Sequence, residues 1–254
     1  MSPTSGGWPH GWVSGLVVFF VGLGSPQAGP ERYDLRWRPT AGTETVYRST
    51  VTMLGVADKS PTLASSRARE RILSVTTDGT VRLSRESFDT IIESDQGQTR
   101  LDDRNRMTFT RRANGEITEL QRDRPLVNEG MIAAIYPIVP AGPVAIGDTW
   151  TATPTVTRAQ SGSKPPANAA PSALRFTYRA IRLETIQDIE SVVVGLQLPA
   201  NPKAKIERLD GLSWISRRDG SVMKLRISFY DSSDAQAKTP SMVMEVTREP
   251  RKGK

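Results

Sequence analysis

Hydrophobic and polar residues alternate along most of the chain that follows residue 30. Tyr33, Leu35 and Trp37 are separated by charged residues, and Tyr47, Val51 and Met53 share one side of the next segment. Successive side chains of a β-strand point to opposite faces, so a period of two predicts strands with one buried face. The pattern therefore indicates a sheet that is covered on one side.

Two Gly-containing pairs divide the first half of the chain into hairpins. Segments around residues 72–76 and 80–83 flank Asp78-Gly79, and residues 107–111 and 116–120 flank Asn114-Gly115. These pairs suit a two-residue turn because both central positions need a positive φ. The first half is predicted to be an antiparallel meander.

The second half shows the same alternation in longer segments. Its apolar rows are Leu174, Phe176, Tyr178 and Ala180; then Val192, Val194, Leu196 and Leu198; then Met223, Leu225, Ile227 and Phe229; and finally Met242, Met244 and Val246. Leu212 and Trp214 precede a further turn at Asp219-Gly220. The sequence predicts a mainly β protein, with a large curved antiparallel sheet or a half-open barrel or sandwich.

Two other segments lack this alternation. Asn128 can cap a short helix near 128–136, which ends at Pro137 and is expected to pack on the sheet. Residues 158–172 are rich in Pro, Ala and Ser and are expected to form a flexible loop. We therefore divide the chain into 1–28, 29–157, 158–172, 173–248 and a basic tail, 249–254. One domain or two are both compatible with this division.

The N-terminal residues resemble a leader rather than a folded element. Residues 13–24 are almost entirely apolar, and no charged residue precedes Glu31. This stretch has the length of a signal-peptide core and is shorter than the roughly 20 residues that span a bilayer. We expect export to the periplasm or beyond. An uncleaved leader, which would attach the protein to a membrane, is the alternative.

Composition excludes several kinds of chemistry. The 254-residue chain has no cysteine, and its one histidine, His10, lies in the leader. The remainder therefore lacks the usual zinc ligands and the usual general base at neutral pH, and we expect no metal, no cofactor and no enzymatic activity. The net charge of +7 is spread among acidic residues without an aromatic platform, so nucleic acid is not an expected partner. The oligomeric state is left open.

The most distinctive motif is P-x-x-P-V-x-x-G-D-x-W, from Pro140 to Trp150. Together with a late hairpin from Gly211 to Gly220, it resembles a group of exported bacterial β-proteins known mainly as domains of unknown function. The resemblance implies secretion and β-architecture, and it implies no catalytic residues. From its position before a strand, Asp148 is expected to serve a turn.

The expected architecture is also similar to that of envelope lipoprotein carriers, in which a half-open sheet surrounds apolar cargo. A lipid or other amphipathic ligand is then the first hypothesis, with Trp37, Phe176, Trp214 and Leu225 as candidate binding residues; an ordinary packed core is the alternative for the same side chains. A structural or assembly role through protein contacts is the second hypothesis. A hydrolase that uses carboxylates alone is the third, although Asp102-Asp103 would point to opposite faces of a strand.

Overall fold

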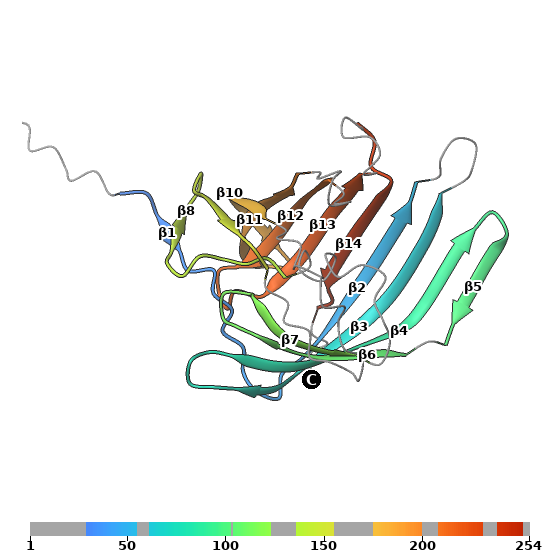
Figure 1. Ribbon diagram of the computed structural model, residues 1–254, viewed down its shortest axis with the longest axis horizontal. Helices are drawn as coiled ribbons and strands as arrows, with labels where there is room; N and C mark the ends of the chain where they lie inside the picture. The colour runs from blue at the N-terminus through green and yellow to red at the C-terminus, as the bar shows by residue number, and fades with distance from the viewer. Residues whose placement is uncertain are drawn as a thin grey trace, which may run out of the picture.

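The computed structural model describes residues 29–54, 61–102, 104–122, 136–154, 175–199, 208–230 and 238–250. Every regular element in these ranges is a β-strand (Figure 1). The strands are β1 (Arg32–Tyr33), β2 (Glu44–Met53), β3 (Thr62–Val75), β4 (Val81–Ser94), β5 (Gly97–Leu101), β6 (Asn105–Arg111), β7 (Ile117–Arg122), β8 (Val144–Ala145), β9 (Thr149–Ala152), β10 (Phe176–Ile186), β11 (Ile189–Leu198), β12 (Arg208–Ser216), β13 (Val222–Tyr230) and β14 (Met242–Arg248).

Twelve of these strands form one curved antiparallel sheet (Figure 1). Its order is β7-β6-β4-β3-β2-β14-β13-β12-β11-β10-β9, and β5 pairs with the far end of β4. The two halves of the sequence meet where β2 pairs with β14, with Val51 opposite Met244. Within the described ranges the sheet ends at β7 and β9 and does not close into a barrel. β1 and β8 form a separate two-stranded ladder.

The mainly β, antiparallel prediction is confirmed, but its helical part is not. The described ranges contain no helix. The helix expected near 128–136 lies outside them except for Tyr136, which is in a bend. The predicted leader and the loop at 158–172 also lie outside the described residues.

Both predicted hairpins are present. Asp78-Gly79 joins β3 to β4, and Asn114-Gly115 joins β6 to β7. Gly79 has φ 79° and donates its N–H to the carbonyl of Thr76, while Asp78 accepts hydrogen bonds from Thr76 and Thr80. The predicted two-residue turns are not found: residues 76–80 and 112–116 connect the strands, and only the glycine of each pair has a positive φ.

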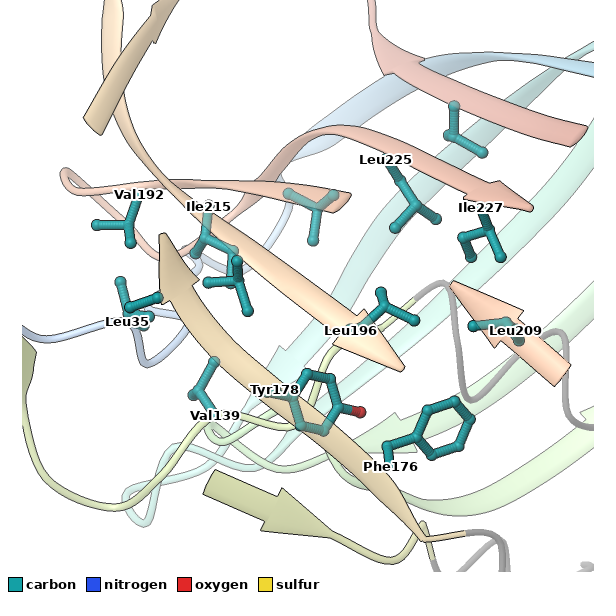
Figure 2. Close-up of a cluster of buried hydrophobic side chains, with 14 of the residues drawn as sticks. Leu35, Val139, Phe176, Tyr178, Val192, Leu196, Leu209, Ile215, Leu225 and Ile227 are labelled. Carbon is teal, nitrogen blue, oxygen red and sulfur yellow. The ribbon is translucent and has the colours of Figure 1, made fainter. Parts of the chain in front are cut away.

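The main core lies on one face of the sheet, which we call the inner face. The alternating rows of β10, β11 and β13 meet there with Leu35 and Val139 (Figure 2). Met223 was predicted to share the inner face with Leu225, Ile227 and Phe229 of β13. The ladder between β12 and β13, however, shifts register after Trp214. The bulge turns Met223 to the outer face, where it packs with Val193 and Trp214.

A short crossing segment, residues 35–38, connects the two ends of the inner face. Leu35 belongs to the main core, whereas Trp37 belongs to a second cluster with Leu83 and Phe109. The backbone N–H of Trp37 donates to the backbone carbonyl of Ala113 (2.9 Å), and the backbone N–H of Arg38 donates to that of Asp219 (2.8 Å). The segment therefore bridges the β6–β7 hairpin and the β12–β13 hairpin.

Each of those hairpins carries a glycine where another part of the backbone approaches closely. A Cβ on Gly115 would overlap the carbonyl of Pro137, and a Cβ on Gly220 would overlap that of Arg36. Both residues also have positive φ, 97° and 68°. The two turns thus need glycine for conformation and for space.

Candidate functional site

A cluster of charged side chains is buried on the inner face beside the main core. Glu70 of β3 and Arg85 of β4 lie opposite each other in the ladder. Arg85 Nη1 is 2.7 Å from Glu70 Oε1, and the two side chains are 10% and 7% exposed. A buried ion pair requires further hydrogen bonds to offset its desolvation.

Tyr136 supplies those hydrogen bonds. Its hydroxyl donates to Glu70 Oε1 and accepts from Arg85 Nη1 (3.1 Å). Burial, reinforced by the charge of Glu70, raises the pKa of Tyr136 well above its ordinary value. Burial by itself would lower the pKa of Arg85, but Tyr136 and Glu70 raise it overall. The three residues therefore keep a neutral phenol between two charged groups.

Arg111, at the end of β6, completes this charge cluster. Its guanidinium lies 4.5 Å from the ring centroid of Trp37 and 4.9 Å from that of Tyr136. Cation–π contacts of this kind contribute about 0.5–2 kcal/mol. The inner face thus contains two buried arginines and one buried glutamate.

A larger cleft, which we call the end cleft, opens at the neighbouring end of the sheet. Its volume is about 400 Å³. The crossing segment, the start of β2, the end of β14 and the turns before β11 and β13 surround it. Its lining residues are Trp37, Arg38, Pro39, Thr40, Thr43, Thr45, Tyr47, Glu70, Ile72, Gln187, Ile189, Ser216, Arg218, Asp219, Ser221, Met223, Arg248, Glu249 and Pro250.

A hydrogen-bonded chain fixes one wall of the end cleft. Arg248 Nη1 donates to Ser221 Oγ (2.9 Å), and that hydroxyl donates to Asp219 Oδ1 (2.6 Å). Burial alone would raise the pKa of Asp219, but the hydrogen bonds from Ser221 and Ser216 and the charge of Arg248 lower it overall. This wall therefore holds its charges in fixed positions.

These buried charged residues were not predicted from the sequence, although the alternation of their strands indicates that they face the core. Arg248 continues the alternation of Met242, Met244 and Val246, and Glu70 continues that of Ala68 and Ile72. A charged residue at a core-facing position of a strand requires a partner. Arg248 is the last residue of β14, and its side chain is only 11% exposed.

A second cavity lies further along the inner face, between β2, β3 and the far end of β4. Its volume is about 250 Å³, and small side chains dominate its walls. The lining residues are Val51, Ala64, Ser65, Ser66, Ser87, Thr90, Leu101 and Asn105. It contains no charged side chain that could orient a ligand.

The four residues proposed from the sequence for ligand binding lie in different parts of the structure. Phe176 and Leu225 belong to the main core, and Trp37 borders the end cleft. Trp214 lies on the outer face, where Lys224 Nζ is 5.1 Å from its ring centroid. Trp37 and Leu225 both line a small cavity of about 20 Å³ beside the charge cluster, and of the four residues Trp37 alone borders the end cleft. Among the cavities of the described ranges, none is lined by all four.

The other candidates occupy turns or lie outside the described ranges. Asp148 accepts a hydrogen bond from the Ala145 N–H (2.9 Å) and lies 3.7 Å from Arg32, as expected for a turn residue. Asp102 is exposed at the end of β5, and Asp103 is not among the described residues. Trp150 donates its indole N–H to Ile138 O (2.8 Å) and stacks on Tyr178.

Comparison with known proteins yields no family. No family model matches the chain, and no curated protein matches it significantly. One similar solved structure is a Bacteroides fragilis protein, named for its inferred export and its YmcC-like fold. It has 10% identity and a TM-score of 0.34, and the match covers 85% of this chain and 97% of that one.

A second similar structure is a β-barrel-like protein of Brucella abortus with the domain of unknown function DUF1849. It has 8% identity and a TM-score of 0.29, with 83% of this chain and 97% of that one covered. We draw nothing about function from similarities at this level. In the described ranges, no helix combines the length and the apolar character needed to cross a membrane.

Proposed function

We propose that the protein is a non-enzymatic binding protein of the bacterial cell envelope and that the end cleft holds its ligand. The observation that carries this proposal is the cleft itself, about 400 Å³ in volume, at the point where the crossing segment meets both halves of the sheet. Binding sites for small molecules commonly have volumes of roughly 300–1,000 Å³. The cleft walls are fixed by backbone and side-chain hydrogen bonds.

The lining favours an amphipathic ligand over a bare hydrocarbon chain. Trp37, Ile72 and Met223 offer apolar contacts, while hydroxyl groups such as Thr45 and the guanidinium of Arg218 offer polar ones. A purely apolar ligand would desolvate those polar groups without hydrogen-bonding them. A lipid-like molecule with a polar head satisfies both parts of the wall.

The acidic residues of the cleft support binding rather than catalysis. Glu70 is paired with Arg85 (2.7 Å), Glu249 with Arg67 (2.7 Å), and Asp219 lies 4.0 Å from Arg248. Each of these carboxylates therefore lies within ion-pair distance of an arginine of the protein itself. The export part of the proposal rests on the apolar leader at residues 13–24.

Native mass spectrometry tests the proposal. We would express the full chain and purify it without detergent from the bacterial periplasm. The expected spectrum shows an adduct of lipid mass that organic extraction removes. The same intact mass reports whether the leader has been cleaved.

Two variants locate the adduct. Thr45→Trp places a large side chain in the end cleft and should lose the adduct. Thr50→Trp, on the same strand but on the opposite face, should keep it. A wild-type protein that is free of adducts and takes up neither oleate nor lysophospholipid would overturn the proposal.

That negative result would favour the assembly role instead. Among the described strands, β7 and β9 each end the sheet with one unpaired edge. Such edges can pair with another chain. Higher-mass assemblies in the same spectra would then identify the protein as a component that acts through protein contacts.

A further inference from the structure

The charge cluster on the inner face is not balanced. Arg85 and Arg111 are buried together with one carboxylate, Glu70, which leaves a net charge of +1 (two positive and one negative). Arg85 is satisfied by Glu70 and Tyr136. Arg111 is only 5% exposed, yet within the described ranges it has no ion-pair partner and no hydrogen-bond acceptor, and its Nε is fully buried.

Stacking does not substitute for those missing acceptors. Trp37 and Tyr136 contact the faces of the Arg111 guanidinium, whereas its five N–H groups point in the guanidinium plane. A buried charge without hydrogen bonds is costly. Burial lowers the pKa of Arg111 from its ordinary value, against the influence of Tyr136 and Glu70.

An internal cavity lies against this unpartnered cation. Its volume is about 20 Å³, and one water-sized atom requires roughly 10–15 Å³. Its polar and aromatic lining residues are Arg111, Arg85, Glu70, Tyr47, Tyr136 and Trp37. The apolar side chains of Val222, Leu225 and Val246 complete the lining. The Tyr47 hydroxyl makes no hydrogen bond within the described part of the chain and is a second free donor.

We propose that this cavity binds one small monovalent anion, held by the guanidinium of Arg111 and the hydroxyl of Tyr47. One negative charge makes the cluster neutral, and one heavy atom fills the space. The side chains of Val222, Leu225 and Val246 offer no hydrogen bonds that would compete for the anion. A divalent oxyanion such as sulfate is too large and would reverse the charge imbalance.

The anion has two sources with the same chemistry. It is either a free halide ion or one carboxylate oxygen of the ligand in the end cleft, because Trp37, Tyr47 and Glu70 border both spaces. The second source rests on the proposed function, whereas the first does not. The test therefore needs one probe for each source.

Thermal unfolding of the full-chain protein distinguishes them. We would measure Tm in sodium chloride, sodium bromide and sodium hexanoate, with sodium sulfate at equal ionic strength as the reference. A ligand at several times its Kd should raise the Tm of a protein of this size by about 3 °C. Arg111→Met should lose that increment, because it keeps the packing volume and removes the charge.

Two further variants keep the test decisive. Tyr47→Phe retains Arg111 but removes the hydroxyl donor, and it should weaken anion affinity about tenfold. It therefore tests the proposed site even if Arg111→Met does not fold. Arg106→Met removes an arginine that lies on the same strand as Arg111 but lines neither the small cavity nor the end cleft; its side chain is 62% exposed, and its loss should leave the response unchanged. A halide response in the wild type identifies a free ion, and a response to hexanoate alone identifies a ligand carboxylate. Equal Tm values in all salts for wild type and Tyr47→Phe would overturn the site.

Discussion

The two halves of the sheet use the same inner face in different ways. In β10–β14 this face is packed with apolar side chains, among them Phe176, Leu196 and Leu225 (Figure 2). In β2–β7 an apolar cluster around Leu83 and Phe109 surrounds two arginines and a glutamate. Among the described residues, the most deeply buried charged side chains, Glu70, Arg85 and Arg111, all lie in β2–β7.

This difference indicates where function is to be sought. Apolar packing tolerates rearrangement, since any side chain of suitable volume provides similar stabilisation. Buried charges must be paired one by one, and each pairing fixes a geometry. Both the end cleft and the small internal cavity border the charge-bearing half, and Glu70 and Tyr47 line the two of them.

The largest predicted effect on the free energy of unfolding comes from replacing buried charged residues of β2–β7 with apolar ones. Glu70→Leu leaves Arg85 buried without a carboxylate and should lower the free energy of unfolding by about 3–5 kcal/mol. The double variant Glu70→Leu/Arg85→Met should recover to within about 1–3 kcal/mol of wild type, because the apolar pair needs no partner but the buried Tyr136 hydroxyl loses both of its own. Urea unfolding of the two single variants and the double variant measures this coupling.

An exposed ion pair between β3 and the neighbouring strand β2 is the control for that cycle. Arg69 and Glu44 lie 3.0 Å apart, and each side chain is 48% exposed. Removing either should change the free energy of unfolding by less than about 1 kcal/mol. A coupling energy at Glu70–Arg85 no larger than at this surface pair would remove the distinction between the two halves.

A smaller effect should follow from disturbing the β6–β7 hairpin at its contact with Pro137. Gly115→Ala adds a Cβ against the carbonyl of Pro137 at a positive φ, so it should cost about 2–3 kcal/mol. Gly42→Ala has a similar φ, 77°, but open space, and should cost only about 1 kcal/mol. Chemical denaturation of both variants separates backbone strain from steric overlap; equal losses would mean that the approach of Pro137 is not a constraint.

Much of this architecture could be predicted from the sequence because its determinants are local. Asp78-Gly79 and Asn114-Gly115 specify tight turns through their own conformational preferences. The alternation in β11 and β14 follows directly from one-sided burial. The segment at Tyr33, Leu35 and Trp37 shows the limit of this reasoning, since all three are buried but only Tyr33 is in a strand.

The candidate site depends on relations that a single sequence does not state. Glu70 and Arg85 are 15 positions apart, and their contact depends on the register of β3 against β4, which shifts twice. Trp214 was grouped with Phe176 and Leu225 because all are large and apolar, yet it points to the outer face. The bulge that moves Met223 arises from pairing with β12 and leaves no trace in local composition.

The smallest effect compares one residue type in the two halves. Tyr47 and Tyr178 both have raised pKa values, Tyr178 to about 12, because burial disfavours the phenolate. Around Tyr47, Glu70 adds to this effect while Arg248, Arg85 and Arg111 oppose it. A tyrosine with a raised folded pKa contributes full stability below about pH 10 and loses it as the pH rises toward the folded value. Tyr47 and Tyr178 should therefore each reduce the free energy of unfolding by about 1.4 kcal/mol per pH unit above pH 10.

Replacing each tyrosine by phenylalanine tests this expectation. Tyr47→Phe and Tyr178→Phe should each flatten the decline in stability between pH 10 and 11.5, measured as urea midpoints at constant ionic strength. The two changes should add, because the side chains lie in different halves of the face. The alternative outcome is that Tyr178→Phe flattens the dependence of the urea midpoint on pH while Tyr47→Phe leaves it unchanged. That result would show that Tyr47 ionises in the folded protein. The surplus positive charge of Arg111 would then be neutralised by a phenolate at high pH, and the anion site should lose its halide response over the same range.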